Sequence, residues 1–217
     1  MTAPHQLTSQ FIPLFNMNGE STMILGFAMN QNRLAVPTWS WAMEKYQPVR
    51  ILELGSYNGG LATALGVHAW NLGRHAPDGI GCKVITYDRM VAPDQRFAPL
   101  SAFLGIEFRQ CDLYAPETVA EIIELVRSPG RTFLLCDGGD KKLEVNTYAP
   151  HLKPGDVIAG HDYNALAYAA EIPDAEKWWP WTELRKDDVA EIVTAAGLVP
   201  FHQEHFDLAG WLAYTKP

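Results

Sequence analysis

Between residues 49 and 164, short apolar runs alternate with segments of helix-forming sequence. Strands that alternate with helices at this spacing call for a parallel sheet with helices on both faces. The C-terminal residues predict two more strands, joined by a tight hairpin at residues 207–210. We therefore expect an α/β fold with a doubly wound, mostly parallel seven-stranded sheet and a C-terminal antiparallel hairpin strand. The predicted strands are 49–55, 83–88, 106–112, 131–139, 156–164, 198–206 and 211–217, and the predicted helices between them are 60–73, 98–105, 116–127, 141–152 and 185–197.

The first 47 residues do not follow this alternation. They hold several Asn, Gly and Pro residues and scattered aromatic residues, which indicates irregular structure. The exception is a short helix predicted over residues 38–46, which Pro48 ends. We therefore divide the chain into an N-terminal segment, 1–47, and an α/β domain, 48–217.

Charge and cysteine usage exclude several classes of partner. The formal charge is −8 and no run of basic residues occurs, so we expect no nucleic-acid partner. Cys82, Cys111 and Cys136 lie far apart without a CxxC pair, which predicts neither a zinc site nor a disulfide framework. No signal-peptide pattern opens the chain and no apolar run matches a bilayer span. We expect a cytoplasmic protein that does not bind membranes. The sequence is compatible with a homo-oligomer.

The glycine-containing loop after the first predicted strand reads "ELGSYNGG", from Glu53 to Gly60. A dinucleotide fingerprint needs glycines spaced G-x-G-x-x-G, so that the pyrophosphate can approach the backbone. Counted from Gly55, the middle position is Tyr57, and the fingerprint fails there. Glu53 would also repel a pyrophosphate, whereas it can accept hydrogen bonds through water from an ammonium group. The loop therefore favours a ligand with a cationic end and no phosphate.

Acidic residues also end the next two predicted strands. Asp88 ends the strand 83–88, where a carboxylate can bind both hydroxyls of a ribose. Asp112 ends the following strand, where it can accept from the amino group of an adenine. S-adenosylmethionine (SAM) combines a nucleoside with a cationic, phosphate-free tail, so it fits these positions.

The ordered motifs "LELGSYNGG", "VITYD", "FRQCD" and "LLCDGG" resemble those of class I SAM-dependent methyltransferases. Together with "YAPHLKPGDVIAGHDY", they are similar to the group of macrocin and cephalosporin-pathway O-methyltransferases. The resemblance covers residues 48–217. It implies transfer of a methyl group from SAM to a small-molecule acceptor, most simply at a hydroxyl oxygen. The cofactor-binding residues implied are Glu53, Gly55, Ser56, Tyr57, Gly59, Gly60, Asp88, Asp112 and Asp137.

Three further residues follow the fourth and fifth predicted strands, at the reacting end of the ligand. Asp137 and Asp162 offer carboxylate oxygens that suit a hard divalent cation such as Mg²⁺. Catechol-type methyltransferases have an acid–amide pair where this chain has His161–Asp162. Because imidazole is not a preferred Mg²⁺ ligand, either the metal differs or His161 has another role, as a general base or an orienting group. We predict Asp137 and His161 as catalytic residues, and Asp137 and Asp162 as ligands of a metal.

Two aromatic segments are candidates for covering the acceptor. One is the loop with Trp178, Trp179 and Trp181, and the other is the N-terminal segment 1–47, because class I methyltransferases commonly cover their acceptor with such segments. Core packing or a dimer contact explains these aromatic residues equally well. Tyr163 and Asn164 are further candidates near the acceptor. Asp140 and Lys141 either join the site or, as we favour, only start the next helix. The alternative functions are an NAD-dependent oxidoreductase and a non-catalytic subunit that binds an adenosyl ligand.

Overall fold

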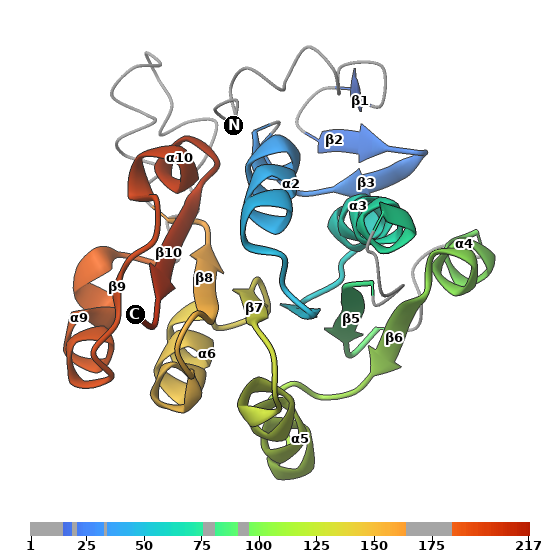
Figure 1. Cartoon of the computed structure of the whole chain (residues 1–217). Helices are drawn as coiled ribbons and strands as arrows, with labels where there is room; N and C mark the ends of the chain where they lie inside the picture. The colour runs from blue at the N-terminus through green and yellow to red at the C-terminus, as the bar shows by residue number, and fades with distance from the viewer. Residues whose placement is uncertain (1–14, 19–20, 33, 76–80, 91–95, 164–183) are drawn as a thin grey trace.

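The computed structural model describes residues 15–18, 21–32, 34–75, 81–90, 96–163 and 184–217. Its main sheet has the strand order β6-β5-β4-β7-β8-β10-β9 (Figure 1). The first five of these strands are parallel, and β10 runs antiparallel to both β8 and β9. The predicted fold class is therefore confirmed. The strands are β4 (Arg50–Leu54), β5 (Lys83–Asp88), β6 (Ile106–Gln110), β7 (Thr132–Cys136), β8 (Val157–His161), β9 (Val199–Pro200) and β10 (Trp211–Thr215).

Helices cover both faces of this sheet (Figure 1). One face packs against α2 (Ala35–Tyr46), α3 (Gly60–His75), α4 (Phe97–Leu104) and α10 (Gln203–Leu208). The other packs against α5 (Pro116–Arg127), α6 (Lys141–Tyr148) with the short η2 (Ala149–His151), and α9 (Lys186–Ala195). Side chains of β4 alternate between the two cores: Ile51 lies in the first, and Leu52 and Leu54 lie in the second. No helix within the described ranges is both long and apolar enough to cross a bilayer.

The prediction of irregular structure in the N-terminal segment is wrong for residues 15–18 and 21–29. They form an antiparallel sheet of β1 (Phe15–Asn18), β2 (Ser21–Ile24) and β3 (Phe27–Met29). Phe27 and Met29 are buried in the core that contains α3, and the residue between them is partly exposed. Three residues of alternation are too few to identify a strand from sequence, so tertiary packing decides this element. The boundary predicted between residues 47 and 48 falls between α2 and β4 and remains a prediction.

The C-terminal strands pair antiparallel as predicted, but the predicted bounds of the first strand and the tight turn between the two strands are wrong. Only Val199 and Pro200 pair with β10, and residues 203–208 form α10 instead of continuing a strand. Pro200 has no backbone N–H to extend the ladder. Phe206 is fully buried in α10, and its ring packs edge-on against Trp39 at 4.8 Å between centroids. Burial of this aromatic side chain under α2 stabilises the helix over the strand.

Candidate active site

A cleft of about 1170 Å³ opens at the carboxyl ends of β4, β5, β7 and β8. In open α/β sheets, ligands bind at this edge, where the strand order reverses. Here the reversal lies between β4 and β7. Gly59 and Gly60 are not among the lining residues. The predicted site residues that line the cleft are Glu53, Gly55, Ser56, Tyr57, Asp88, Asp112, Asp137, His161 and Asp162.

The glycines of the loop after β4 are held by close contacts within the protein. Gly55 has φ of +92°, and a Cβ there would lie 2.2 Å from the carbonyl oxygen of Asp137. A Cβ on Gly59 would meet the Phe97 ring at 2.6 Å, and one on Gly60 would meet the carbonyl oxygen of Ala28 at 2.6 Å. Gly59 and Gly60 thus bring the start of α3 against α4 and β3. Their predicted contact with a cofactor remains a prediction.

Tyr57 gives the loop its unusual geometry. It has φ of +46°, a left-handed conformation that is uncommon outside glycine, and its side chain is exposed. Its backbone N–H donates to Oδ2 of Asp88 at 3.0 Å, and the N–H of Met90 donates to Oδ1 of the same carboxylate at 2.9 Å. Asp88 is therefore fixed in orientation at the end of β5. Asp112, at the surface, accepts the N–H of Tyr114 at 3.0 Å in a similar turn.

Glu53 lies buried on the α3 side of β4, where its carboxyl group accepts the hydroxyl of Thr86 at 2.5 Å. The Ser56 hydroxyl in turn bonds to Thr86. Burial raises the pKa of Glu53 to about 8, and the negative charges of Asp137 and Asp88 add to the rise. A cationic group bound nearby would favour the ionised form instead.

This pKa predicts how stability depends on pH. The folded protein keeps the Glu53 proton up to about pH 8, whereas the unfolded chain releases it near pH 4.5. The contribution of the protonated carboxyl is therefore complete below pH 4.5 and is lost as the pH rises through 8. Replacing Glu53 by Gln removes this dependence. Between pH 4.5 and 8, the free energy of unfolding of the variant should rise relative to wild type by about 1 kcal/mol for each pH unit. Urea unfolding at several pH values measures this difference.

Exposed Glu124, on α5, provides the control. Glu124→Gln should follow wild type at each pH. A Glu53→Gln variant whose stability stays parallel to wild type from pH 5 to 8 would contradict a buried, protonated Glu53.

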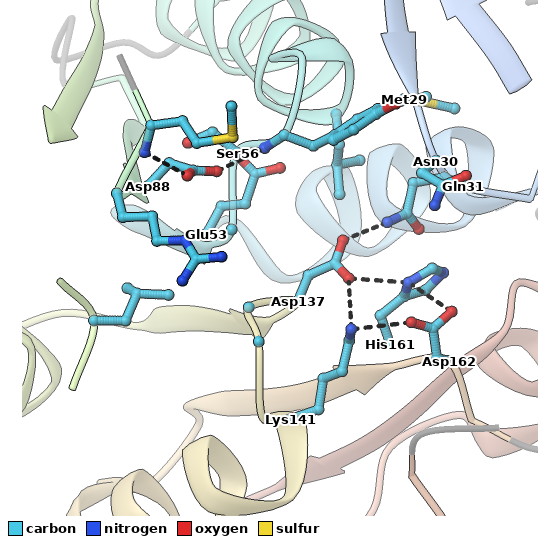
Figure 2. Close-up of a pocket in the computed structure, with 18 of the residues that line it drawn as sticks. Met29, Asn30, Gln31, Glu53, Ser56, Asp88, Asp137, Lys141, His161 and Asp162 are labelled. Atoms are coloured by element: carbon cyan, nitrogen blue, oxygen red, sulfur yellow. Dashed lines mark hydrogen bonds and ion pairs between the residues drawn. The ribbon is translucent and has the colours of Figure 1, made fainter. Parts of the chain in front are cut away.

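At the other end of the cleft, charged side chains from three elements converge (Figure 2). Asp137 follows β7, His161 ends β8 and is 2% exposed, Asp162 follows it, and Lys141 begins α6. His161 Nδ1 lies 3.0 Å from Asp137 Oδ1 and 3.3 Å from Asp162 Oδ1. Lys141 Nζ lies 3.0 Å from Asp162 Oδ2 and 3.9 Å from Asp137 Oδ1. The structure therefore brings Asp137, His161 and Asp162 together with the buried Lys141, a further candidate of the sequence analysis.

In this cluster, the two carboxyl groups of Asp137 and Asp162 are paired with two basic groups, those of His161 and Lys141. Burial lowers the pKa of His161, but Asp137 and Asp162 outweigh it and raise that pKa to about 9. Burial raises the pKa of Asp162, but His161 and Lys141 outweigh it and lower the pKa. Burial also raises the pKa of Asp137, against the opposing effect of His161 and Lys141. At neutral pH the ring of His161 thus carries both protons in this arrangement.

Solved structures in the comparison share this fold. CmcI with magnesium and SAM matches with a TM-score of 0.62 at 18% identity, covering 90% of this chain and 76% of that one. A Podospora anserina methyltransferase bound to S-adenosylhomocysteine (SAH) gives 0.53 at 12% identity, covering 86% and 79%. A Staphylococcus aureus protein described as a caffeoyl-CoA O-methyltransferase gives 0.52 at 13% identity, covering 99% and 92%.

The chain has the class I methyltransferase fold. At these identities the likeness concerns the fold alone. No protein-family model matches the sequence, and a search of curated proteins gives no significant match.

Within this methyltransferase fold, sequence reasoning missed Gln31, just beyond β3. The indole N–H of Trp211 can only donate, and it bonds to Oε1 of Gln31 at 3.1 Å. This contact fixes the amide, so that Nε2 donates to Asp137 Oδ2 at 2.5 Å. The residue joins the N-terminal sheet to the reacting end of the cleft (Figure 2). No sequence signal marks it, because its role depends on where that separate sheet packs.

We expect Gln31→Leu to destabilise the protein by about 1–3 kcal/mol, because it leaves the buried indole N–H and the Asp137 oxygen without this partner. Asn32→Asp is the control. Asn32 lies in the same loop and is partly exposed; its side-chain amide donates to the carbonyl oxygen of Leu208 at 3.1 Å, and its Oδ1 accepts the N–H of Leu34 at 2.9 Å. Aspartate keeps the acceptor and removes only the exposed donor. Its loss should cost less than about 1 kcal/mol. Equal losses for the two variants in urea unfolding would contradict the buried link.

The structure describes some of the other residues that were predicted to lie near the acceptor. Lys141 begins α6, and its side chain also reaches the charged cluster. The end of the N-terminal sheet lines the cleft through Met29, Asn30 and Gln31, whereas a lid role for the segment stays a prediction. Tyr163 is buried. Asn164 and the tryptophans at 178, 179 and 181 lie outside the described residues.

Proposed function

We propose that this chain is an enzyme that transfers the methyl group of SAM to a hydroxyl oxygen of a small-molecule acceptor. The observation that carries the proposal is the set of acids at the carboxyl ends of β4, β5 and β6. Glu53, Asp88 and Asp112 all line one cleft, behind a loop whose middle position is Tyr57. This arrangement suits a cationic nucleoside and opposes a pyrophosphate. The CmcI and Podospora anserina structures, which contain SAM and SAH, support it.

In the proposed complex, Asp88 binds the ribose hydroxyls and Asp112 binds the adenine amino group. Glu53 accepts hydrogen bonds through water from the ammonium group of the tail. The acceptor oxygen attacks the methyl carbon, the carbon–sulfur bond breaks, and SAH leaves. The chain contributes alignment and exclusion of water. Asp137 and His161, at the end of the cleft, are the groups that we propose to act on the acceptor hydroxyl. They orient it, and His161 can accept its proton only after the ring has released one of the two protons that it carries in this arrangement.

A divalent metal is part of the proposal. Asp137, His161 and Asp162 each offer one donor atom, and these atoms lie within 4.8 Å of one another. Asp137 and Asp162 would hold the ion, which would supply Lewis acidity and lower the pKa of the acceptor hydroxyl. Exhaustive treatment with EDTA should then abolish transfer, and added metal should restore it. Full activity after that treatment would remove the metal from the proposal.

Transfer of a labelled methyl group from SAM to a panel of phenols, sugars and hydroxylated lipids tests the reaction. Label in an O-methylated product is the expected result. SAH binding without transfer to any acceptor in the panel would favour the alternative of a non-catalytic adenosyl-binding subunit. Label on nitrogen would keep the enzyme class and correct the acceptor atom.

A further inference from the structure

The two aspartates at the reacting end present matching oxygens to the same histidine nitrogen. Oδ1 of Asp137 and Oδ1 of Asp162 lie 3.0 and 3.3 Å from Nδ1 of His161. Around a cation with bonds of about 2.1 Å, adjacent donors at right angles are about 3.0 Å apart. The distances from His161 Nδ1 to the two carboxylate oxygens therefore match the spacing of donors around one small divalent cation, and the donor atoms of the three residues all lie within 4.8 Å of one another.

The outer oxygens of both aspartates are held by other side chains. Gln31 Nε2 donates to Asp137 Oδ2, and Lys141 Nζ pairs with Asp162 Oδ2 at 3.0 Å. These contacts leave the two Oδ1 atoms turned toward His161, although Lys141 also lies 3.9 Å from Asp137 Oδ1. The His161 ring packs against Trp211 with 4.8 Å between centroids. Such outer contacts orient metal ligands in proteins and tune their affinity.

The histidine changes which ion the donor set favours. Mg²⁺ prefers oxygen donors and keeps several waters, whereas imidazole suits first-row transition metals. We propose that His161 is a metal ligand through Nδ1, and that Asp137, His161 and Asp162 form a mixed nitrogen–oxygen site for a divalent first-row transition metal. Binding releases the proton that Nδ1 carries. This inference rests on the metal of the proposed function, and it assigns His161 as a ligand of that metal.

Metal binding alone tests the assignment, without SAM or acceptor. Pulsed electron paramagnetic resonance on wild-type protein with Mn²⁺ should show modulation from a coordinated ¹⁴N nucleus. Calorimetry at pH 8 with Co²⁺ and Mg²⁺ gives the affinity ratio of the two ions. His161→Glu, an all-oxygen set, should lower the ratio of Co²⁺ to Mg²⁺ affinity at least tenfold and abolish the ¹⁴N signal.

His151→Glu is the matched control, since His151 lies on η2 and bonds to Arg127 at 2.8 Å, outside the cluster. It should keep both the affinity ratio and the ¹⁴N signal. Because His161 is buried, His161→Glu is checked by thermal melting. Asp162→Asn is the second variant, and asparagine tolerates the left-handed φ of +57° at this position. It should weaken both ions at least tenfold and retain the ¹⁴N signal.

Wild-type protein that binds none of these ions would overturn the inference, and so would bound Mn²⁺ without ¹⁴N modulation. An affinity ratio unchanged in folded His161→Glu would do the same. A titration of the same sample with SAH separates these failures from failure of the proposed function. Protein that binds SAH but no metal would keep the methyl-donor site and lose the metal.

Discussion

Replacing Gly55 by Ala is expected to destabilise the protein by about 4 kcal/mol or more, a large share of the total for a typical domain. Two costs combine at this position. An L-residue at φ of +92° is strained by about 1–2 kcal/mol, and the added Cβ would lie 2.2 Å from the carbonyl oxygen of Asp137. The ends of β4 and β7 would have to separate, which disrupts the floor of the cleft. Urea unfolding and expression in soluble form measure the effect.

Gly105 separates these two costs. It also has a left-handed conformation, with φ of +70°, but a Cβ there would meet nothing within 4 Å. Gly105→Ala should therefore cost only the backbone strain, about 1–2 kcal/mol. If the two variants lose the same stability, the close approach of Gly55 to Asp137 is wrong.

Replacing Asp88 by Ala is expected to weaken SAH binding about 100-fold. In the proposed complex its carboxylate binds both ribose hydroxyls, and a hydrogen bond to a charged group contributes about 1.5–3 kcal/mol. The change also removes the partner of the Tyr57 and Met90 backbone N–H groups, which position the loop after β4. Calorimetric titration with SAH gives the affinity.

Glu107→Ala is the control for Asp88. Glu107 is an acid on the neighbouring β6, where it pairs with Lys83 and Arg109 outside the cleft. Its loss should change SAH affinity less than twofold, although it costs these surface ion pairs. An Asp88→Ala variant that is folded and binds SAH as tightly as wild type would place the ribose elsewhere.

The parts of the fold and the site that sequence predicts are those with a local cause. Parallel strands end at one edge of a sheet, so acids such as Asp88 and Asp137, at the ends of apolar runs, could be expected to meet there. The helix at residues 116–127 was predicted with its observed bounds, because a proline at its start and an acid in its first turn are local signals.

What sequence did not predict depends on contacts between distant segments. Gln31 reaches Asp137 across 106 positions of sequence, so no local pattern identifies it. Phe206 sits in the stretch 198–206 that was predicted as a strand, but packing against Trp39 stabilises a helix there. Gly60 was predicted from its place in a ligand loop, whereas the structure shows the packing against β3 that requires a glycine.

The claim that this cleft binds a methyl donor is tested most directly by titrating the wild-type protein with SAH, SAM and NAD⁺ in a calorimeter. SAH and SAM should bind to a single site, and NAD⁺ should give no measurable heat of binding, because the loop at Tyr57 and the acids beside it oppose a pyrophosphate. NAD⁺ binding, or failure of both adenosyl ligands to bind, would contradict the account.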